Sequence, residues 1–296
     1  MIVTTSDGKI ARTSPVPFGD IVEDLSIPYG VANALRDTEA RGLKPLTSPQ
    51  LLDLRLDCPS LKDCLWSNWY TTSSGVYVVG NNVYVVYGLK HPLTSHQRVR
   101  TAVDEGLVKY AAKLTLEESE LFSGRKVEGL RDYDAFLRET QDKDLTDEQF
   151  GIIAPLSLFG GLPNNYMKLR KWVKDPRAVM LAGGKRRAEA YAEVLDRNKV
   201  EKHWLSLEAE LGKEDRGWLV FVYRVDHDDY GLYVRDLHGY GRFVGVAPEA
   251  QVGVRQKNEA SGEPLESKIV YLQNKRFARL DGQLYIVAPE GTRVDE

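Results

Sequence analysis

The chain has 296 residues, and its 40 Lys and Arg against 43 Asp and Glu give a net charge of −3. This balance excludes a polycation that holds nucleic acid by charge alone. A hydrophobic content of 42% suffices for a packed core, and two cysteines are too few for a disulfide scaffold. No apolar run is long enough to span a bilayer and no secretory signal is visible, so we expect a cytoplasmic protein with no membrane partner.

Proline and glycine punctuate the first part of the chain, and we treat residues 1–69 as a turn-rich N-terminal region. A short amphipathic helix is expected over residues 30–40. A second helix is expected to start at Thr47, with Pro49 at its first helical position.

The clearest hairpin of the sequence is GVYVVGNNVYVVYG, residues 75–88. Two runs of β-branched and aromatic residues flank Gly80-Asn81-Asn82, which tolerate positive φ angles. Both runs are apolar at every position, so we expect two central strands that are covered on both faces.

Helical spacing of apolar residues follows over residues 95–122, where Thr115 and Glu118 form a capping box. Another helix is expected over residues 131–139, and one more from Asp147 into the apolar stretch 150–159. We assign residues 70–165 to an α/β core.

A basic helical segment, residues 166–216, precedes a region in which the apolar period changes to two. Short turns separate these strands, so residues 217–296 are expected to form a small antiparallel β-barrel. The expected fold class is therefore α+β, with a mixed N-terminal half, a central β-hairpin, a helical middle and a β-rich C-terminal module.

Basic and aromatic residues are interleaved over residues 166–187, a composition typical of surfaces that follow phosphates and stack on bases. The candidate nucleic-acid-binding residues are Lys168, Arg170, Lys171, Trp172, Lys185, Arg186 and Arg187. The alternative is a solvated helix face that acidic neighbours balance.

Three smaller groups have the residue types of metal sites. Cys58, Cys64, His91 and His96 are zinc-type ligands, although the gap between the cysteines is long. The Asp226–Asp229 cluster fits a divalent cation or an ordinary turn. Glu266-Ser267-Lys268 matches the E-x-K element of a nuclease class, but it follows a turn instead of lying on a strand.

One constellation spans a longer part of the chain. Gly75-Val76-Tyr77 and Val86-Tyr87-Gly88 lie at the outer ends of the hairpin, and an odd-numbered turn would place both tyrosines on one face. Arg98 starts a following helix, Glu148 opens a later one, and Asn164 follows Pro163. In this order and rough spacing, residues 75–165 resemble the GIY-YIG nuclease superfamily, although the second motif is one residue short.

The resemblance implies a metal-dependent DNA endonuclease, and the appended modules favour the site-specific kind. Glu148 would bind a divalent cation such as Mg²⁺ on the scissile phosphate, and Tyr77 would help to deprotonate the nucleophile. Arg98 would offset charge on the phosphorus, and Tyr87 and Asn164 would position these groups. The basic segment would hold double-stranded DNA.

Two further hypotheses belong to other classes. The first is a non-enzymatic nucleic-acid-binding or regulatory protein that uses the basic segment alone. The second is a structural or assembly protein that makes protein contacts through an apolar surface, and it leaves a homo-oligomer open.

Overall fold

The structure is a computed structural model of the whole chain. It describes residues 3–4, 10–12, 19–57, 64–88, 90–108, 111–124, 126–141, 149–159, 165–200, 202–206, 214–225, 229–235, 237–246, 270–272, 275–280 and 283–287.

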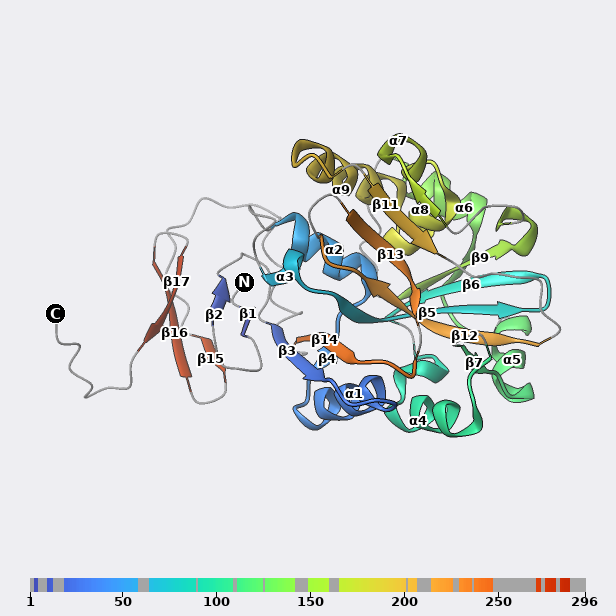
Figure 1. Ribbon diagram of the computed structural model, residues 1–296, viewed down its shortest axis with the longest axis horizontal. Helices are drawn as coiled ribbons and strands as arrows, with labels where there is room; N and C mark the ends of the chain where they lie inside the picture. Colours follow the sequence, from blue (N-terminus) through green and yellow to red (C-terminus); the bar gives the residue numbers. More distant parts are fainter. Residues whose placement is uncertain are drawn as a thin grey trace.

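A nine-stranded sheet forms the centre of the protein, with strand order β10-β11-β13-β12-β5-β6-β9-β8 and with β7 paired to β12 (Figure 1). Its strands are β5 (Tyr70–Val79), β6 (Asn82–Tyr87), β7 (Ala112–Lys113), β8 (Leu130–Asp132), β9 (Phe150–Pro155), β10 (Asn165–Met167), β11 (Lys202–Ser206), β12 (Arg216–Val222) and β13 (Asp229–Arg235).

The hairpin β5–β6 lies in the middle of this sheet, as expected. Gly80 adopts a φ of 55° in the turn, a conformation that glycine reaches without steric cost. Alternate residues of β5 are buried in two separate hydrophobic clusters, Val76 and Val78 in one and Tyr77 and Val79 in the other. The prediction of central strands covered on both faces is confirmed.

Helices cover both faces of the central sheet (Figure 1). One cluster joins the sheet to α2 (Ser48–Leu56), α3 (Cys64–Ser67), α6 (Tyr133–Glu139), α7 (Leu169–Trp172), α8 (Pro176–Ala182) and α9 (Lys185–Arg197). The other cluster joins it to α1 (Gly30–Ala40), η1 (Pro92–Thr94), α4 (His96–Glu105) and α5 (Leu116–Ser123). None of the described helices is long and apolar enough to cross a membrane.

Two smaller sheets complete the described structure. The first has the order β2-β1-β3-β14-β4 and contains β1 (Val3–Thr4), β2 (Ile10–Arg12), β3 (Gly19–Asp24), β4 (Lys44–Pro45) and β14 (Gly241–Val246). The second contains β15 (Val270–Leu272), β16 (Lys275–Leu280) and β17 (Gln283–Val287).

The α+β class is therefore as expected, but the C-terminal β-barrel is wrong for the strands that the structure describes. β12 pairs with β5 and β13 inside the central sheet, whereas β14 pairs with β3 in the second sheet. An apolar period of two indicates a strand and which of its faces is buried, but it does not identify the neighbouring strand.

Two of the expected helix starts are confirmed. Thr47 and Gln50 form a capping box at α2, and Thr115 and Glu118 form one at α5.

The apolar stretch after Gln149 is strand β9 followed by the 3₁₀ helix η2 (Leu156–Phe159), so the helix expected there is wrong. A short apolar run does not distinguish a buried strand from a buried helix.

Candidate functional site

Tyr77 and Tyr87 point to opposite faces of the central sheet. Val79 pairs with Asn82, so the turn has two residues, and Tyr77 lies opposite Tyr84. Tyr87 is three positions from Tyr84 and therefore faces the other way. The two phenols are buried in different hydrophobic clusters, so the shared site expected for an odd-numbered turn does not form.

Tyr77 belongs to a buried hydrogen-bond chain. His91 Nε2 lies 2.8 Å from the carbonyl of Ser73, which can only accept, so Nε2 carries the proton. Nδ1 of His91 then accepts from the Tyr77 hydroxyl at 2.6 Å, and the Leu93 backbone N–H donates to that hydroxyl at 3.3 Å. Burial raises the pKa of Tyr77 and lowers the pKa of His91 to about 4. Both side chains are neutral at pH 7, and the chain holds the segment before α4 against the sheet.

Tyr87 is also fully enclosed. Its hydroxyl donates to the Met180 carbonyl in α8, and its ring lies 4.5 Å from that of Phe150 between centroids. Burial raises the pKa of Tyr87 well above its usual value. The phenol therefore acts as a hydrogen-bond donor inside the core.

Arg98 forms an ion pair with a carboxylate on the next helix. Its Nε and Nη2 donate to the two oxygens of Glu118 at 2.6 and 2.9 Å, and Nη2 also reaches the Lys113 carbonyl at 2.6 Å. Burial acts to raise the pKa of Glu118, but hydrogen bonds from Arg98 and Thr115 outweigh it and hold the pKa low. This bidentate pair joins α4 to α5 and offers no open guanidinium to a phosphate.

The other residues of the proposed nuclease site, Glu148 and Asn164, lie outside the described residues. The same holds for Cys58, for Asp226 to Asp228 and for the segment Glu266-Ser267-Lys268. Within the described part of the chain, no group of three or more His, Cys, Asp and Glu could hold a metal ion. His91 accepts a hydrogen bond from Tyr77, and His96 Nδ1 lies 2.6 Å from a Glu39 carboxylate oxygen.

The basic segment divides into buried and exposed side chains. Trp172 is fully buried, so it is not available as a stacking platform. Arg187 is 5% exposed and binds Asp53 at 2.6 and 3.0 Å, which joins α9 to α2. These two members of the expected nucleic-acid surface are therefore structural.

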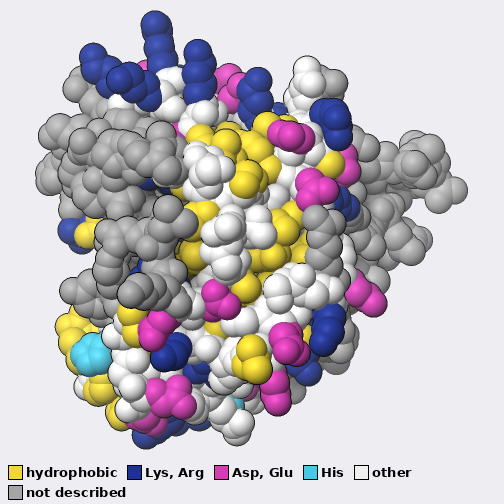
Figure 2. Space-filling model, turned by 90° about the vertical axis from the view of Figure 1, so that its right-hand side faces the viewer, with side chains coloured by type: hydrophobic (Ala, Val, Ile, Leu, Met, Phe, Trp, Pro, Cys, Tyr) yellow, Lys and Arg dark blue, Asp and Glu magenta, His cyan; other side chains and the backbone are white. Residues whose placement is uncertain are grey.

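Other cations of this segment remain at the surface. Lys168, Arg170, Lys171 and Lys174 are exposed in and around α7, and Lys185 and Arg186 are exposed at the start of α9. Figure 2 shows Lys and Arg side chains gathered along the top of the molecule, where Figure 1 places α7 and α9. The segment therefore has an exposed basic surface, but Trp172, the aromatic side chain expected on that surface, is buried.

A second surface was not anticipated. Trp69, just before β5, is partly exposed and stacks on Phe221 at 5.5 Å and on Tyr240 at 6.5 Å between ring centroids. The guanidinium carbon of Arg242 lies 4.9 Å from the Trp69 ring centroid, in cation–π geometry. Arg242 also donates to Glu23 and Asn68, which fixes its plane.

Exposed apolar side chains extend this surface. Asp24 pairs with Gly241 at the end of the β3–β14 ladder, so Leu25 and Tyr240 are the next residues of the two segments. Leu25 and Tyr240 are 54% and 38% exposed. We call Leu25, Trp69, Tyr240 and Arg242 the aromatic patch. A single sequence does not bring these residues together, because β3, β5 and β14 are far apart in the chain.

Comparison with known proteins gives one result that bears on the fold. No family model matches the chain, and no curated protein sequence matches it. A solved structure described as "Accommodation of massive sequence variation in Nanoarchaeota by the C-type lectin fold" superposes with a TM-score of 0.61 at 20% identity, over 79% of this chain and 100% of that chain. The likeness is one of fold. It agrees with the α+β class and carries no activity to this chain.

Proposed function

We propose that this chain is a non-catalytic recognition protein that binds a partner protein through the aromatic patch. The observation that carries the proposal is the stack of Tyr240, Trp69 and Arg242 beside the exposed Leu25. Contiguous exposed apolar surface on a folded protein is typical of interaction sites.

The chemistry of the aromatic patch fits a protein partner. Trp, Tyr and Arg are the residues that most often dominate the free energy of protein–protein binding. The charge of Arg242 is offset by Glu23, so the patch has little attraction for a polyanion. The stacked rings and the paired guanidinium are held in place before binding, which lowers the entropy cost of association.

The fold is compatible with such a role. The similar structure is described as a C-type lectin fold that accommodates massive sequence variation in Nanoarchaeota. A scaffold that accommodates sequence variation is suited to carrying a recognition surface. This supports the proposal without naming a ligand.

Metal-dependent cleavage of DNA remains a hypothesis, and the described side chains lend it no support. Tyr77, Tyr87 and Arg98 all have internal partners, and the two tyrosines face opposite sides of the sheet. We expect duplex DNA to stay intact when it is incubated with the purified protein and Mg²⁺. Cleavage that needs Mg²⁺ and is lost in Glu148→Ala would establish the nuclease instead.

The recognition role is tested by quantitative co-purification from cells that express the protein. We expect a partner, a second copy of the chain included, to be retained by the wild type and lost at least tenfold in the double variant Leu25→Ser, Tyr240→Ser. Leu116→Ser in α5 is the matched control, because Leu116 is 77% exposed and lies outside the aromatic patch. Equal retention by all three proteins would refute the proposal.

A second candidate function is the binding of nucleic acid. It is favoured by the exposed cations Lys168, Arg170, Lys171 and Lys174, which lie within seven residues of one another. Four cations on one short segment can follow a phosphate backbone without any catalytic group.

A further inference from the structure

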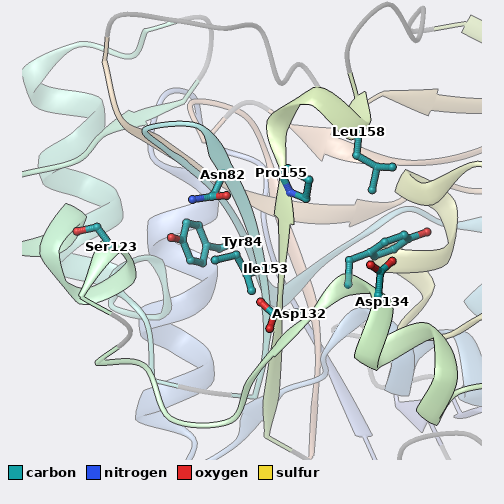
Figure 3. A pocket seen from close by; sticks show the side chains of 9 residues that line it. Asn82, Tyr84, Ser123, Asp132, Asp134, Ile153, Pro155 and Leu158 are labelled. Atoms are coloured by element: carbon teal, nitrogen blue, oxygen red, sulfur yellow. The ribbon is translucent and has the colours of Figure 1, made fainter.

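A hollow of about 460 Å³ lies at the edge of the central sheet, where α5, α6 and the end of β9 meet (Figure 3). β8 ends at Asp132, opposite Ile153, whereas β9 continues to Pro155. The hollow therefore wraps around the part of β9 that extends past its shorter neighbour. A volume of this size is in the range of small-molecule sites.

Apolar and aromatic side chains form the inner wall of the hollow. Tyr84 and Ile153 contribute from one face of the sheet, and Tyr133 and Leu158 from the other. Figure 3 shows Tyr84 and Leu158 on opposite sides of the strand that bears Ile153 and Pro155. A ligand with an apolar portion would replace water along this wall.

The charged residues of the lining are all acidic. Asp132 and Asp134 are exposed carboxylates on either side of Tyr133 in the sequence, and the lining contains no Lys or Arg. Burial, together with the nearby charges of Asp175 and Asp134, raises the pKa of Tyr133 to about 12. The phenol is therefore neutral at pH 7, and its ring is a cation–π acceptor beside the carboxylate of Asp134.

We infer that this hollow binds an organic cation, an ammonium or guanidinium group on an apolar stem. The stem contacts Pro155 and Leu158, and the cation lies near Asp134 and the Tyr133 ring. The site is independent of the aromatic patch, which involves β3, β14 and Trp69. Free amines and the Lys or Arg side chains of a peptide share this chemistry.

The test is a titration followed by NMR chemical shifts, with n-butylammonium chloride as the probe and n-butanol as its neutral analogue. We expect saturable shifts for residues of β9 and α6 with the cation, and at least tenfold weaker binding of the alcohol. A peptide acetyl-Leu-Lys-Leu-amide forms a second arm. Tighter binding of the peptide than of n-butylammonium would identify a protein side chain as the natural ligand, and the reverse order would identify a free amine.

Substitutions distinguish binding of the cation in the hollow from its attraction to surface charge in general. Asp134→Asn, at an exposed position, is expected to weaken n-butylammonium binding about five- to tenfold, as loss of a charge partner beside an aromatic ring predicts. Glu128→Gln, which removes an exposed acid outside the lining, is expected to leave binding unchanged. Absence of saturation with both cationic probes, or equal affinity of wild type and Asp134→Asn, would overturn the inference.

Discussion

Burial of Tyr77 and Tyr87 in the central sheet turns two phenols with acid–base potential into structural hydrogen-bond donors. Both pKa values are raised by desolvation, and both hydroxyls have acceptors inside the protein, His91 and the Met180 carbonyl. The sequence could supply the residue types and their order, but not the face on which each lies. One residue in the turn decided that, because the side-chain period of a strand is two.

Burial of His91 makes the stability of the folded protein depend on pH. The pKa of His91 in the folded protein, about 4, lies below the 6.5 of an exposed histidine, so the unfolded chain binds the extra proton between these values. This stabilisation is complete above pH 6.5 and is lost as the pH falls toward 4. We expect the free energy of unfolding to fall by about 2 kcal/mol from pH 7 to pH 5 through this residue.

Urea denaturation at the two pH values measures the effect. His91→Gln is the control, because it keeps a polar side chain that does not titrate. We expect it to be less stable at pH 7 and to show a smaller difference between pH 7 and pH 5. An equal difference in both proteins would show that His91 is not the titrating group.

Helix α7 shows how one element combines a buried and an exposed role. Trp172 is fully buried, whereas its neighbour Lys171 is exposed. Trp172→Ala should lower the free energy of unfolding by about 3–5 kcal/mol, because a large cavity replaces the indole. Lys171→Ala should change it by less than about 0.5 kcal/mol. Similar effects of the two substitutions in a denaturant titration would contradict this packing.

The exposed cations around α7 give a separate prediction at the scale of the element. If Lys168, Arg170, Lys171 and Lys174 bind phosphates, their joint replacement by Gln should reduce the slope of log K against log salt for duplex DNA by about 3–4. Replacement of the exposed Lys44, Lys90, Lys126 and Lys199 by Gln removes the same charge elsewhere and should change the slope little. Fluorescence anisotropy at several salt concentrations measures both slopes, and equal slopes would exclude this segment as the DNA site.

Elements with strong local signals could be predicted from the sequence. The helix start at Thr47, the capping box at Thr115 and the apolar hairpin at β5–β6 need only neighbouring residues to form. β9 was mistaken for a helix, because its apolar run is short and its partners β6 and β8 come from elsewhere. Pairings over long sequence distances, such as β3 with β14, leave no trace in a single sequence.

At the scale of the whole molecule, the net charge of −3 is the sum of basic and acidic surfaces that lie apart. Exposed cations gather around α7 and the start of α9, acidic residues line the hollow beside β9, and the aromatic patch has a paired arginine. The charge total therefore excludes only an indiscriminate polycation. The two surfaces that carry our proposals unite segments far apart in the chain, so neither could be recognised from the sequence.

The central claim, that the aromatic patch contacts a partner protein, is tested most directly by photo-crosslinking in cells that express the protein. A photoreactive phenylalanine derivative replaces Tyr240 in one protein and Leu116 in another, both being exposed apolar positions. We predict a discrete protein adduct from position 240, a second copy of the chain being one such adduct, and none above background from position 116. Equal adducts from both positions, or none from position 240, would contradict the account.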